Sequence, residues 1–565
     1  MGSREAIRSV QYTSRVLRAC SGVRALLGIC AAAMASCLFY LNAVDVPLKW
    51  ATWRAADTTA QENSPLGTLL SKSKQSASPQ PPHILFVVAD DLGWNDVGFN
   101  GNPHVKTPHL DGLAQAGVIL NYSYVQPICS PTRSCLMSGR YPYRTGMQHS
   151  HVVPERGFGL DCNVSTIAQR LNRLGYSTHL VGKWHLGFCN KKYLPTQRGF
   201  DTFFGHYLGA GDYYTHKSVG FPPSALKTPL GERGQKVEAL DLHRDTSNSS
   251  STVTSDTGTY ASYLYRREAI RIVKSHNASS GPLYLYLALQ APHSPLQAPA
   301  SYQRMYDGTV NARRRVYSAM VSAMDDTVGE VVQAFKKRGL WKNTLMVFTT
   351  DNGGRVDLGG NNWPLRGCKS TVWEGGTRGV AFVHGQMLNK RGYTYNGLMH
   401  AVDWYPTLLS AAGQPETDKA IDGVDMWQAL RNNLSSRRTE FVYNIDKTDG
   451  VFAIRLGKWK YIRGGSGGLY DYWYKAGEDD KKYPLYLREV SSRHQHESGP
   501  WLFDIEADPL EKNNLYEELP NQVKTMEARL AEHMEGYVGD LFSQHPPDPR
   551  SNPARHGGVW SPGWC

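Results

Sequence analysis

Four short runs of β-branched and aliphatic residues end abruptly at polar side chains. Unbroken apolar runs of this length are typical of strands that are buried on both faces of a sheet. The sequence therefore predicts four buried strands, each followed directly by candidate functional residues. The runs are ILFVVA before Asp90, THLVG before Lys183, LYLYLALQAP before His293 and TLMVFTT before Asp351.

Segments with helical spacing of apolar residues separate these strands. They cover residues 107–117, 164–174 and 316–335, and the first has proline at its second residue and glycine at its end. Alternation of strand and helix predicts an α/β fold with a large mixed, mostly parallel sheet flanked by helices. In such sheets ligands bind beyond the carboxyl ends of the strands, so we expect the four polar clusters to meet at one edge.

Oxygen ligands dominate two of these clusters. Asp90, Asp91, Asp351 and Asn352 offer carboxylate and amide oxygens, which select a hard cation such as calcium or magnesium. Calcium is the better prediction, because it takes about six to eight oxygen ligands and leaves room for substrate. Pairs of aspartates also occur in solvated turns and helix caps, and Asp325–Asp326 and Asp479–Asp480 are interpreted in that way.

Basic side chains accompany the same strand ends. Lys183, His185, His293 and Lys369 are donors suited to a doubly charged oxyanion and to proton transfer at a leaving oxygen. A single histidine or lysine is more often a core or surface residue than a catalytic one. Placement beside the acidic clusters favours function for three of them, whereas Lys369 has no clear strand before it.

Cys129 stands two residues before a proline that suits the first turn of a helix. Its side chain would then face unpaired N–H groups and the positive end of the helix dipole, which favours anionic chemistry. Two other interpretations stay open for an unmodified cysteine here. It could be a thiol nucleophile of low pKa, or a buried structural residue.

The segment CSPTRSCLMSGRYPYRTG around Cys129 resembles the signature of the formylglycine-dependent sulfatases. From His83 onward, further segments look like sulfatase segments in family order, most of all those of arylsulfatase B and arylsulfatases I and J. Three residues depart from the usual pattern: Thr132 stands where serine is common, and Cys135 and Cys368 add thiols. The similar segments include ILFVVADDLGWNDVGFNG, VGKWHLG, QAPHSP, FTTDNGG and WEGGTRG.

The resemblance implies a mechanism and a role for each candidate residue. Cys129 would be converted to formylglycine by a formylglycine-generating enzyme, and one hydroxyl of its hydrate would attack sulfur while the other later expels sulfate. A plain cysteine or serine lacks the second hydroxyl and would be trapped as a covalent ester. The implied roles are one calcium ion bound by Asp90, Asp91, Cys129, Asp351 and Asn352; Arg133 orienting the formylglycine; catalysis by Lys183, His185, His293 and Lys369; and substrate binding by Lys183, His293 and Lys369.

Composition divides the chain into four predicted parts. Residues 1–44 join five arginines to an apolar run at 25–41 and are interpreted as a signal peptide or signal-anchor, so membrane contact is expected only if this segment is retained. Residues 45–82 are a low-complexity linker. Residues 83–435 would be the catalytic domain, and residues 436–565, where LFDIEADPLEKNNL resembles the family's terminal domain, a smaller α+β domain with an antiparallel sheet.

Export is also indicated by five N-x-S/T sequons, at Asn121, Asn163, Asn248, Asn277 and Asn433. We expect a glycoprotein that enters the ER lumen and is then secreted or delivered to lysosomes. In an oxidising compartment a Cys162–Cys189 disulfide is a candidate, although spacing alone does not determine connectivity.

The formal charge of +12 favours an anionic substrate. The sequence contains no basic run interleaved with aromatic residues, so it gives no indication of a nucleic-acid-binding module. The sequence therefore predicts an arylsulfatase that acts on a sulfated glycan of the N-acetylgalactosamine 4-sulfate type, or on aryl sulfates. Two alternatives stay open. One is a phosphonate or phosphodiester hydrolase with the same metal-rim geometry, and the other is a glycan-binding protein without turnover.

Overall fold

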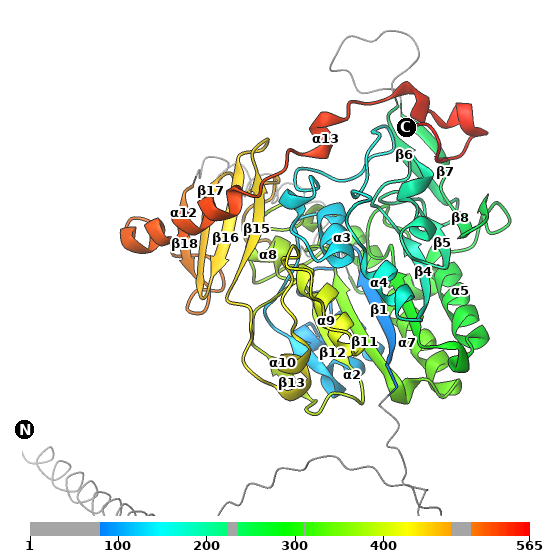
Figure 1. Ribbon diagram of the computed structural model, residues 1–565, viewed down its shortest axis with the longest axis horizontal. Helices are drawn as coiled ribbons and strands as arrows, with labels where there is room; N and C mark the ends of the chain where they lie inside the picture. Colours follow the sequence, from blue (N-terminus) through cyan, green and yellow to red (C-terminus); the bar gives the residue numbers. More distant parts are fainter. Residues whose placement is uncertain (1–79, 223–235, 310, 476–498) are drawn as a thin grey trace, which may run out of the picture. The chain divides into compact units, whose positions relative to one another are not determined.

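A ten-stranded sheet forms the centre of the described part of the chain in the computed structural model (Figure 1). Its four central strands are parallel neighbours and contain the four apolar runs predicted from the sequence. Antiparallel pairs towards both edges make the sheet mixed. In spatial order the strands are β13 (Tyr393–Tyr395), β2 (Val118–Leu120), β12 (Ala381–His384), β11 (Thr344–Thr350), β1 (His83–Ala89), β10 (Leu283–Ala288), β4 (Ser177–Lys183), β5 (Thr202–His206), β8 (His243–Thr246) and β9 (Ser250–Thr252).

The structure describes residues 80–222, 236–309, 311–475 and 499–565. The predicted signal segment, most of the predicted linker and the Asp479–Asp480 pair lie outside these residues. Within the described ranges, no helix combines the length and the apolar character needed to cross a membrane.

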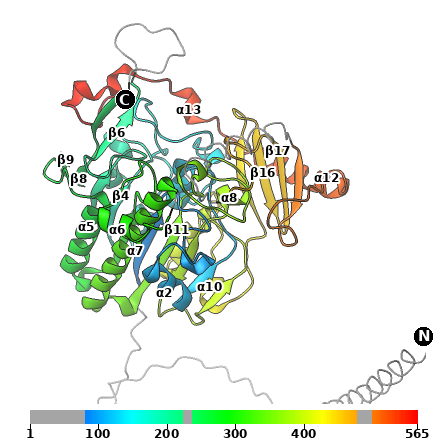
Figure 2. The same cartoon turned by 180° about the vertical axis from the view of Figure 1, so that it is seen from behind.

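Helices cover both faces of the sheet. Successive residues of each central strand point to opposite sides, and because these residues are apolar, both faces must be buried. In β1, Ile84 and Phe86 join one hydrophobic core, whereas Leu85 and Val87 join the other. Figures 1 and 2 show the two helical layers from opposite sides. The first core contains α3 (Cys129–Ser138), α4 (Ile167–Arg173), α9 (Trp404–Ala411) and α10 (Trp427–Asn432), and the second α2 (Pro108–Ala116), α5 (Ala261–Ser275), α6 (Ala300–Arg304) and α7 (Ala312–Lys337). The predicted α/β fold is confirmed.

The predicted helices differ from the observed ones only at their ends. Residues 107–117 contain α2, which begins at Pro108 and ends before Gly117. Within residues 164–174, α4 starts at Ile167, because the Thr166 side chain and Gln169 form a reciprocal hydrogen-bonded cap. Residues 316–335 lie inside the longer α7.

A second, antiparallel sheet of four strands follows in the C-terminal part, as predicted. Helix α12 (Pro520–Met534) packs against it through Val523, Met526 and Leu530, which share the first hydrophobic core with the strands. The boundary between residues 435 and 436 stays a prediction. The strands are β15 (Glu440–Asp446), β16 (Val451–Leu456), β17 (Trp459–Gly464) and β18 (Trp501–Asp504).

Residues 538–565 leave this small sheet and return to the part of the chain that contains the ten-stranded sheet, with α13 (Leu541–Gln544) on the way (Figure 1). Cys565 forms a disulfide with Cys189, and the backbone N–H of Gly563 donates to the Cys189 carbonyl at 2.7 Å. The suggested Cys162–Cys189 bridge is therefore wrong, and Cys162 is an exposed free thiol. Cys565, the partner of Cys189, is 376 residues away in the sequence, so only the folded chain shows the pairing.

A buried group of charges joins the small sheet to the part of the chain that contains the ten-stranded sheet. Lys460 of β17 lies 3.0 Å from Glu374, the first residue of α8 (Glu374–Thr377), and 2.7 Å from Glu511. The Tyr124 hydroxyl donates to the other carboxylate oxygen of Glu374 at 2.8 Å. All these side chains are buried, so their charges are compensated by one another and by the nearby Arg378, whose Nη1 is 3.9 Å from Glu374.

We expect Lys460→Met to destabilise the fold by about 3–5 kcal/mol, because two buried carboxylates would lose their shared cation. Denaturant or thermal unfolding measures this effect. Lys458→Met is the matched control: Lys458 lies beside β17, is partly exposed and pairs with Asp504 at 2.5 Å, so its loss should cost less than about 1 kcal/mol. Equal stability of the two variants would contradict the proposed importance of the buried group.

Candidate active site

The carboxyl ends of the central strands meet at one edge of the sheet. Ala89 of β1 pairs with Thr350 of β11, and the backbone N–H of Asp351 donates to the Ala89 carbonyl at 3.0 Å. The residues after these two strands therefore leave the sheet side by side, in the place where parallel sheets bind ligands. The predicted residues delivered to this edge are Asp90 and Asp91 after β1, Lys183 at the end of β4 with His185 two residues on, His293 after β10, and Asp351 and Asn352 after β11.

Cys129 is the first residue of α3, so its side chain lies at the N-terminus of the helix as expected. Its Sγ is 3.5 Å from Asp90 Oδ1 and 3.3 Å from Lys369 Nζ. Burial raises the pKa of the thiol to about 12, and the charges of Asp351 and Asp90 act in the same direction. Burial and the two carboxylates thus favour the protonated form of an unmodified thiol over a thiolate nucleophile.

Four buried oxygen-bearing residues form the acidic part of the site: Asp90, Asp91, Asp351 and Asn352. The side-chain N–H of Asn352 donates to Asp91 Oδ1 at 2.7 Å. The carboxamide oxygen of Asn352 is buried and accepts no hydrogen bond from the described residues. A buried oxygen without a donor, beside three carboxylates, fits a hard cation that prefers oxygen ligands.

Permanent cations lie against each carboxylate. The Arg133 guanidinium donates to Asp351 Oδ2 through Nη2 at 2.7 Å and through Nε at 3.1 Å. Lys183 Nζ is 2.5 Å from Asp90 Oδ2, and Lys369 Nζ is 2.5 Å from Asp91 Oδ1. The negative and positive groups therefore match in number, and a bound divalent cation would make the edge positive towards an anionic ligand.

The carboxylates differ in how well they are compensated. Burial opposes ionisation of Asp90 and Asp91, but Lys183 beside the first and Lys369 beside the second hold the pKa of both below the usual range. Burial raises the pKa of Asp351 to about 6, and the Asp90 charge adds to this increase. Asp351 is thus the carboxylate that would benefit most from an additional positive charge.

The two histidines present one ring nitrogen each to the site. His185 Nε2 is 2.9 Å from the Val152 carbonyl, which can only accept, so we assign the proton to Nε2 and leave Nδ1 as an acceptor. That Nδ1 is buried and has no hydrogen-bond partner among the described residues. His293 Nδ1 is 2.7 Å from the Ser294 carbonyl, and its Nε2 is 3.6 Å from Asp91 Oδ2.

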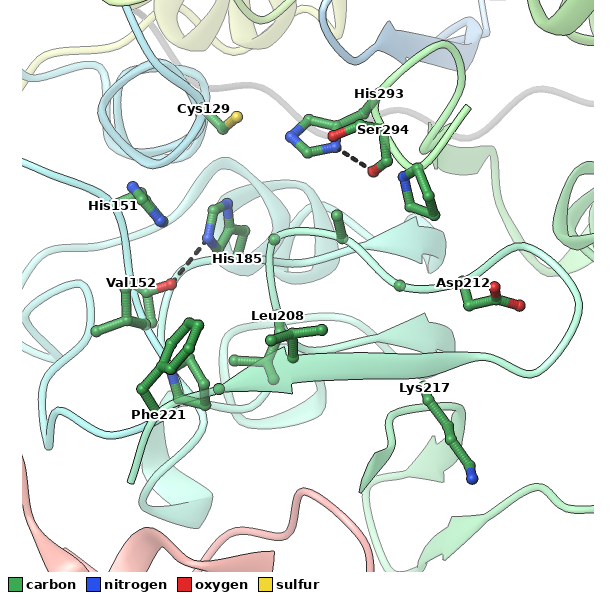
Figure 3. A pocket seen from close by; sticks show the side chains of 18 of the residues that line it. Cys129, His151, Val152, His185, Leu208, Asp212, Lys217, Phe221, His293 and Ser294 are labelled. Atoms are coloured by element: carbon green, nitrogen blue, oxygen red, sulfur yellow. Dashed lines mark hydrogen bonds between the residues drawn. The ribbon is translucent and has the colours of Figure 1, made fainter. Parts of the chain in front are cut away.

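A cavity of about 860 Å³ opens onto this cluster (Figure 3). Cys129, His185, His293 and Lys369 line its charged end. The rest of the lining comes from loops and from the hairpin of β6 (Lys217–Gly220) and β7 (Val237–Leu240). It mixes apolar and charged side chains: Val152, Leu208, Val219 and Phe221 with Glu155, Asp212, Lys217, Lys236 and Glu238. The cavity can thus hold an anionic group at one end and a group with both apolar and polar parts beside it.

Lys369 reaches the site from a loop, as its sequence context indicated. The neighbouring backbone is held on both sides: the N–H of Ser370 donates to the Pro127 carbonyl and the N–H of Val372 to the Ser466 carbonyl, each at 2.8 Å. Ser466 lies just beyond β17, so the small C-terminal sheet supports the loop that carries Lys369.

All ten predicted site residues lie in this one cluster, although their chemical roles stay predictions. Asp325, which was given no ligand role, accepts from the backbone N–H groups of His109 and Leu110 at the start of α2. Sequence reasoning missed His151 in the cavity wall. His151 lies in a loop and does not follow any of the four apolar strands, so the pattern of a strand ending in polar residues could not indicate it.

The fold is that of an α/β enzyme whose carboxylates and cations are gathered at the carboxyl ends of its central strands. Residues 82–414 match the family model described as Sulfatase. The chain therefore belongs to the sulfatase family, and it is a sulfuric ester hydrolase of the arylsulfatase type.

Individual relatives support this assignment. The chain is 40% identical to mouse (Mus musculus) arylsulfatase J over 506 residues, covering 86% of this chain and 81% of that protein. It is 31% identical to mouse N-acetylgalactosamine-6-sulfatase over 423 residues, covering 72% and 76%. The crystal structure of Ps i-CgsB in complex with k-i-k-neocarrahexaose is similar at a TM-score of 0.67 and 28% identity, covering 82% of this chain and 94% of that one.

Proposed function

We propose that this sulfatase removes sulfate from a sulfated glycan of the N-acetylgalactosamine 4-sulfate type, and from aryl sulfates, with formylglycine formed from Cys129 and one calcium ion. The observation that carries the proposal is the position of Cys129. Its Sγ lies at the start of α3, in contact with both Lys369 and Asp90, at the charged end of the cavity. A nucleophile in this place meets a substrate sulfate surrounded by donors.

Asp90, Asp91, Asp351 and Asn352 would hold the calcium ion together with the modified Cys129. The unpartnered Asn352 oxygen and the raised pKa of Asp351 support this ligand set. When bound, calcium supplies positive charge that polarises the sulfate group and the nucleophile. Arg133 donates from both Nε and Nη2 to Oδ2 of Asp351, and so holds that oxygen while Oδ1 stays available to the ion.

Formylglycine supplies, when formed, a hydrated aldehyde whose two hydroxyls serve attack and release. Lys183, Lys369 and His293 would neutralise the sulfate oxygens and donate a proton to the leaving alcohol. His185 Nδ1 is a free acceptor held in place by the Nε2 contact with Val152, so it would accept a proton from a hydroxyl at position 129. Exclusion of water by the cavity walls strengthens these contacts.

The mixed lining of the cavity favours a sugar sulfate. Val152, Leu208 and Phe221 can pack against the C–H face of a sugar ring or against an arene, and the charged residues of the lining can meet polar groups of the ligand. Two similar proteins carry names or ligands of this kind: one is an N-acetylgalactosamine-6-sulfatase, and the Ps i-CgsB crystal contains a neocarrahexaose. These observations support a glycan substrate.

The secretory pathway is the proposed compartment, with secretion or lysosomal delivery as the destination. The Cys189–Cys565 disulfide fits an oxidising environment. Asn163, Asn248, Asn277 and Asn433 are exposed and open to glycosylation. Asn121 is partly buried, and its side-chain oxygen accepts from Arg378 at 2.6 Å. A formylglycine-generating enzyme in that pathway would be the modifying partner.

We expect Cys129→Ala to lower kcat/KM for 4-nitrophenyl sulfate at least about 10³-fold, because the nucleophile is lost. The variant should still be exported and show a cooperative melt. Cys162→Ala is the matched control, since Cys162 is an exposed free thiol that does not line the cavity, and it should keep full activity. The mass of the Cys129 peptide from a secretory host reports the aldehyde directly.

Substantial turnover by Cys129→Ala would exclude Cys129 as the nucleophile. A thiol mass in a fully active enzyme would exclude the modification. A strong preference for 4-nitrophenyl phosphate over the sulfate would favour the alternative phosphoryl hydrolase.

Calcium binding is tested by thermal unfolding of protein treated with a chelator and then titrated with calcium. A concentration about 100-fold above Kd should stabilise the wild type by about 2.7 kcal/mol. Asn352→Ala should lose most of this response, because its carboxamide oxygen is an expected ligand. Asn521→Ala is the matched control, since Asn521 is an exposed residue of α12 and belongs to none of the groups of possible metal ligands. An undiminished response in Asn352→Ala would remove Asn352 from the site.

A further inference from the structure

His151 lies in the wall of the cavity, next to the charged end. Figure 3 shows its ring between Cys129 and Val152, on the same side of the cavity as His185. The His151 and His185 rings have centroids 5.6 Å apart. Its side chain is exposed, whereas Val152 beside it is buried. The imidazole thus faces the space that a substrate would fill.

The backbone next to His151 is attached to the active site from two directions. The N–H of Val152 donates to Ser130 Oγ at 3.0 Å, and the Val152 carbonyl accepts from His185 at 2.9 Å. Ser130 Oγ in turn donates to the His185 carbonyl at 2.9 Å. These hydrogen bonds fix the backbone next to His151 relative to α3 and to His185. A residue that contacts a substrate needs a defined position of this kind.

The His151 ring has no hydrogen bond or ion pair with another described residue. Neighbouring protein atoms displace part of the water around the exposed His151 ring and lower its pKa, and the charges of Lys369, Lys183 and His293 lower it further. Both effects favour the neutral ring, which offers the cavity one donor and one acceptor. Such a group contributes little to the charge around a sulfate but matches a hydroxyl, which also donates and accepts.

We propose that His151 is a specificity-determining residue that hydrogen-bonds a sugar hydroxyl of the alcohol part of the substrate, close to the esterified oxygen. The inference rests on the proposed glycan sulfatase function and extends it. The sulfate end of the cavity would bind any sulfate ester, whereas His151 discriminates a polyhydroxyl alcohol from a simple arene, which offers no hydroxyl at that place.

The test compares the wild type with His151→Phe, which keeps a planar ring but removes both polar atoms, and with His151→Gln, which restores a donor and an acceptor. We measure kcat/KM for N-acetylgalactosamine 4-sulfate and for 4-nitrophenyl sulfate. The ratio of sugar to aryl values should fall about tenfold in His151→Phe, the size of one neutral hydrogen bond, and recover at least partly in His151→Gln. Purely structural damage would lower both values together and leave the ratio unaltered.

Binding is measured in parallel in the Cys129→Ala background, by calorimetry with the same two esters. His151→Phe should weaken binding of the sugar sulfate several-fold more than binding of the aryl sulfate. If the wild type turns over neither ester, the proposed function fails, but this binding difference still decides the role of His151. Equal losses for the two esters, or no loss for either, would overturn the proposal.

Discussion

The burial of three carboxylates at one edge of a parallel sheet is the constraint on which the rest of the structure depends. Asp90, Asp91 and Asp351 would repel one another strongly in a medium of low polarity, so each must have its own cation. Arg133, Lys183 and Lys369 meet this requirement from α3, from β4 and from a distant loop. The site therefore forms only when these three elements are correctly packed.

The loop with Lys369 links the small C-terminal sheet to the reaction. Its backbone is fixed by Ser466, beyond β17, and the loop continues into Glu374, whose carboxylate is held by Lys460 of the same strand. A change in how the small sheet packs would thus move Lys369 away from Asp91. This arrangement gives the second sheet a direct part in maintaining the charge balance of the first.

What the sequence could predict follows from the range of each interaction. The central strands and their polar ends were predictable, because burial on both faces leaves a local pattern and parallel ends must meet at one edge. The Cys189–Cys565 pairing was not, since it depends on the return of a distant segment. Only the family resemblance predicted that Lys369 belongs to the site, and no sequence pattern indicated His151. The positions of both residues depend on tertiary contacts of loops.

The cavity separates sulfate binding at its charged end from contacts with the alcohol along its wall, and different constraints act on the residues of these two parts. The charged end cannot change one residue at a time, because every loss leaves a buried charge uncompensated. The opposite wall contains side chains from loops and from the β6–β7 hairpin, where Trp560 of the returning segment donates to the Ser218 carbonyl at 3.0 Å. Substitutions there, and at His151, alter the shape and hydrogen bonding offered to the alcohol while sulfate binding persists. Substrate choice in this fold should therefore vary with the wall rather than with the charged end.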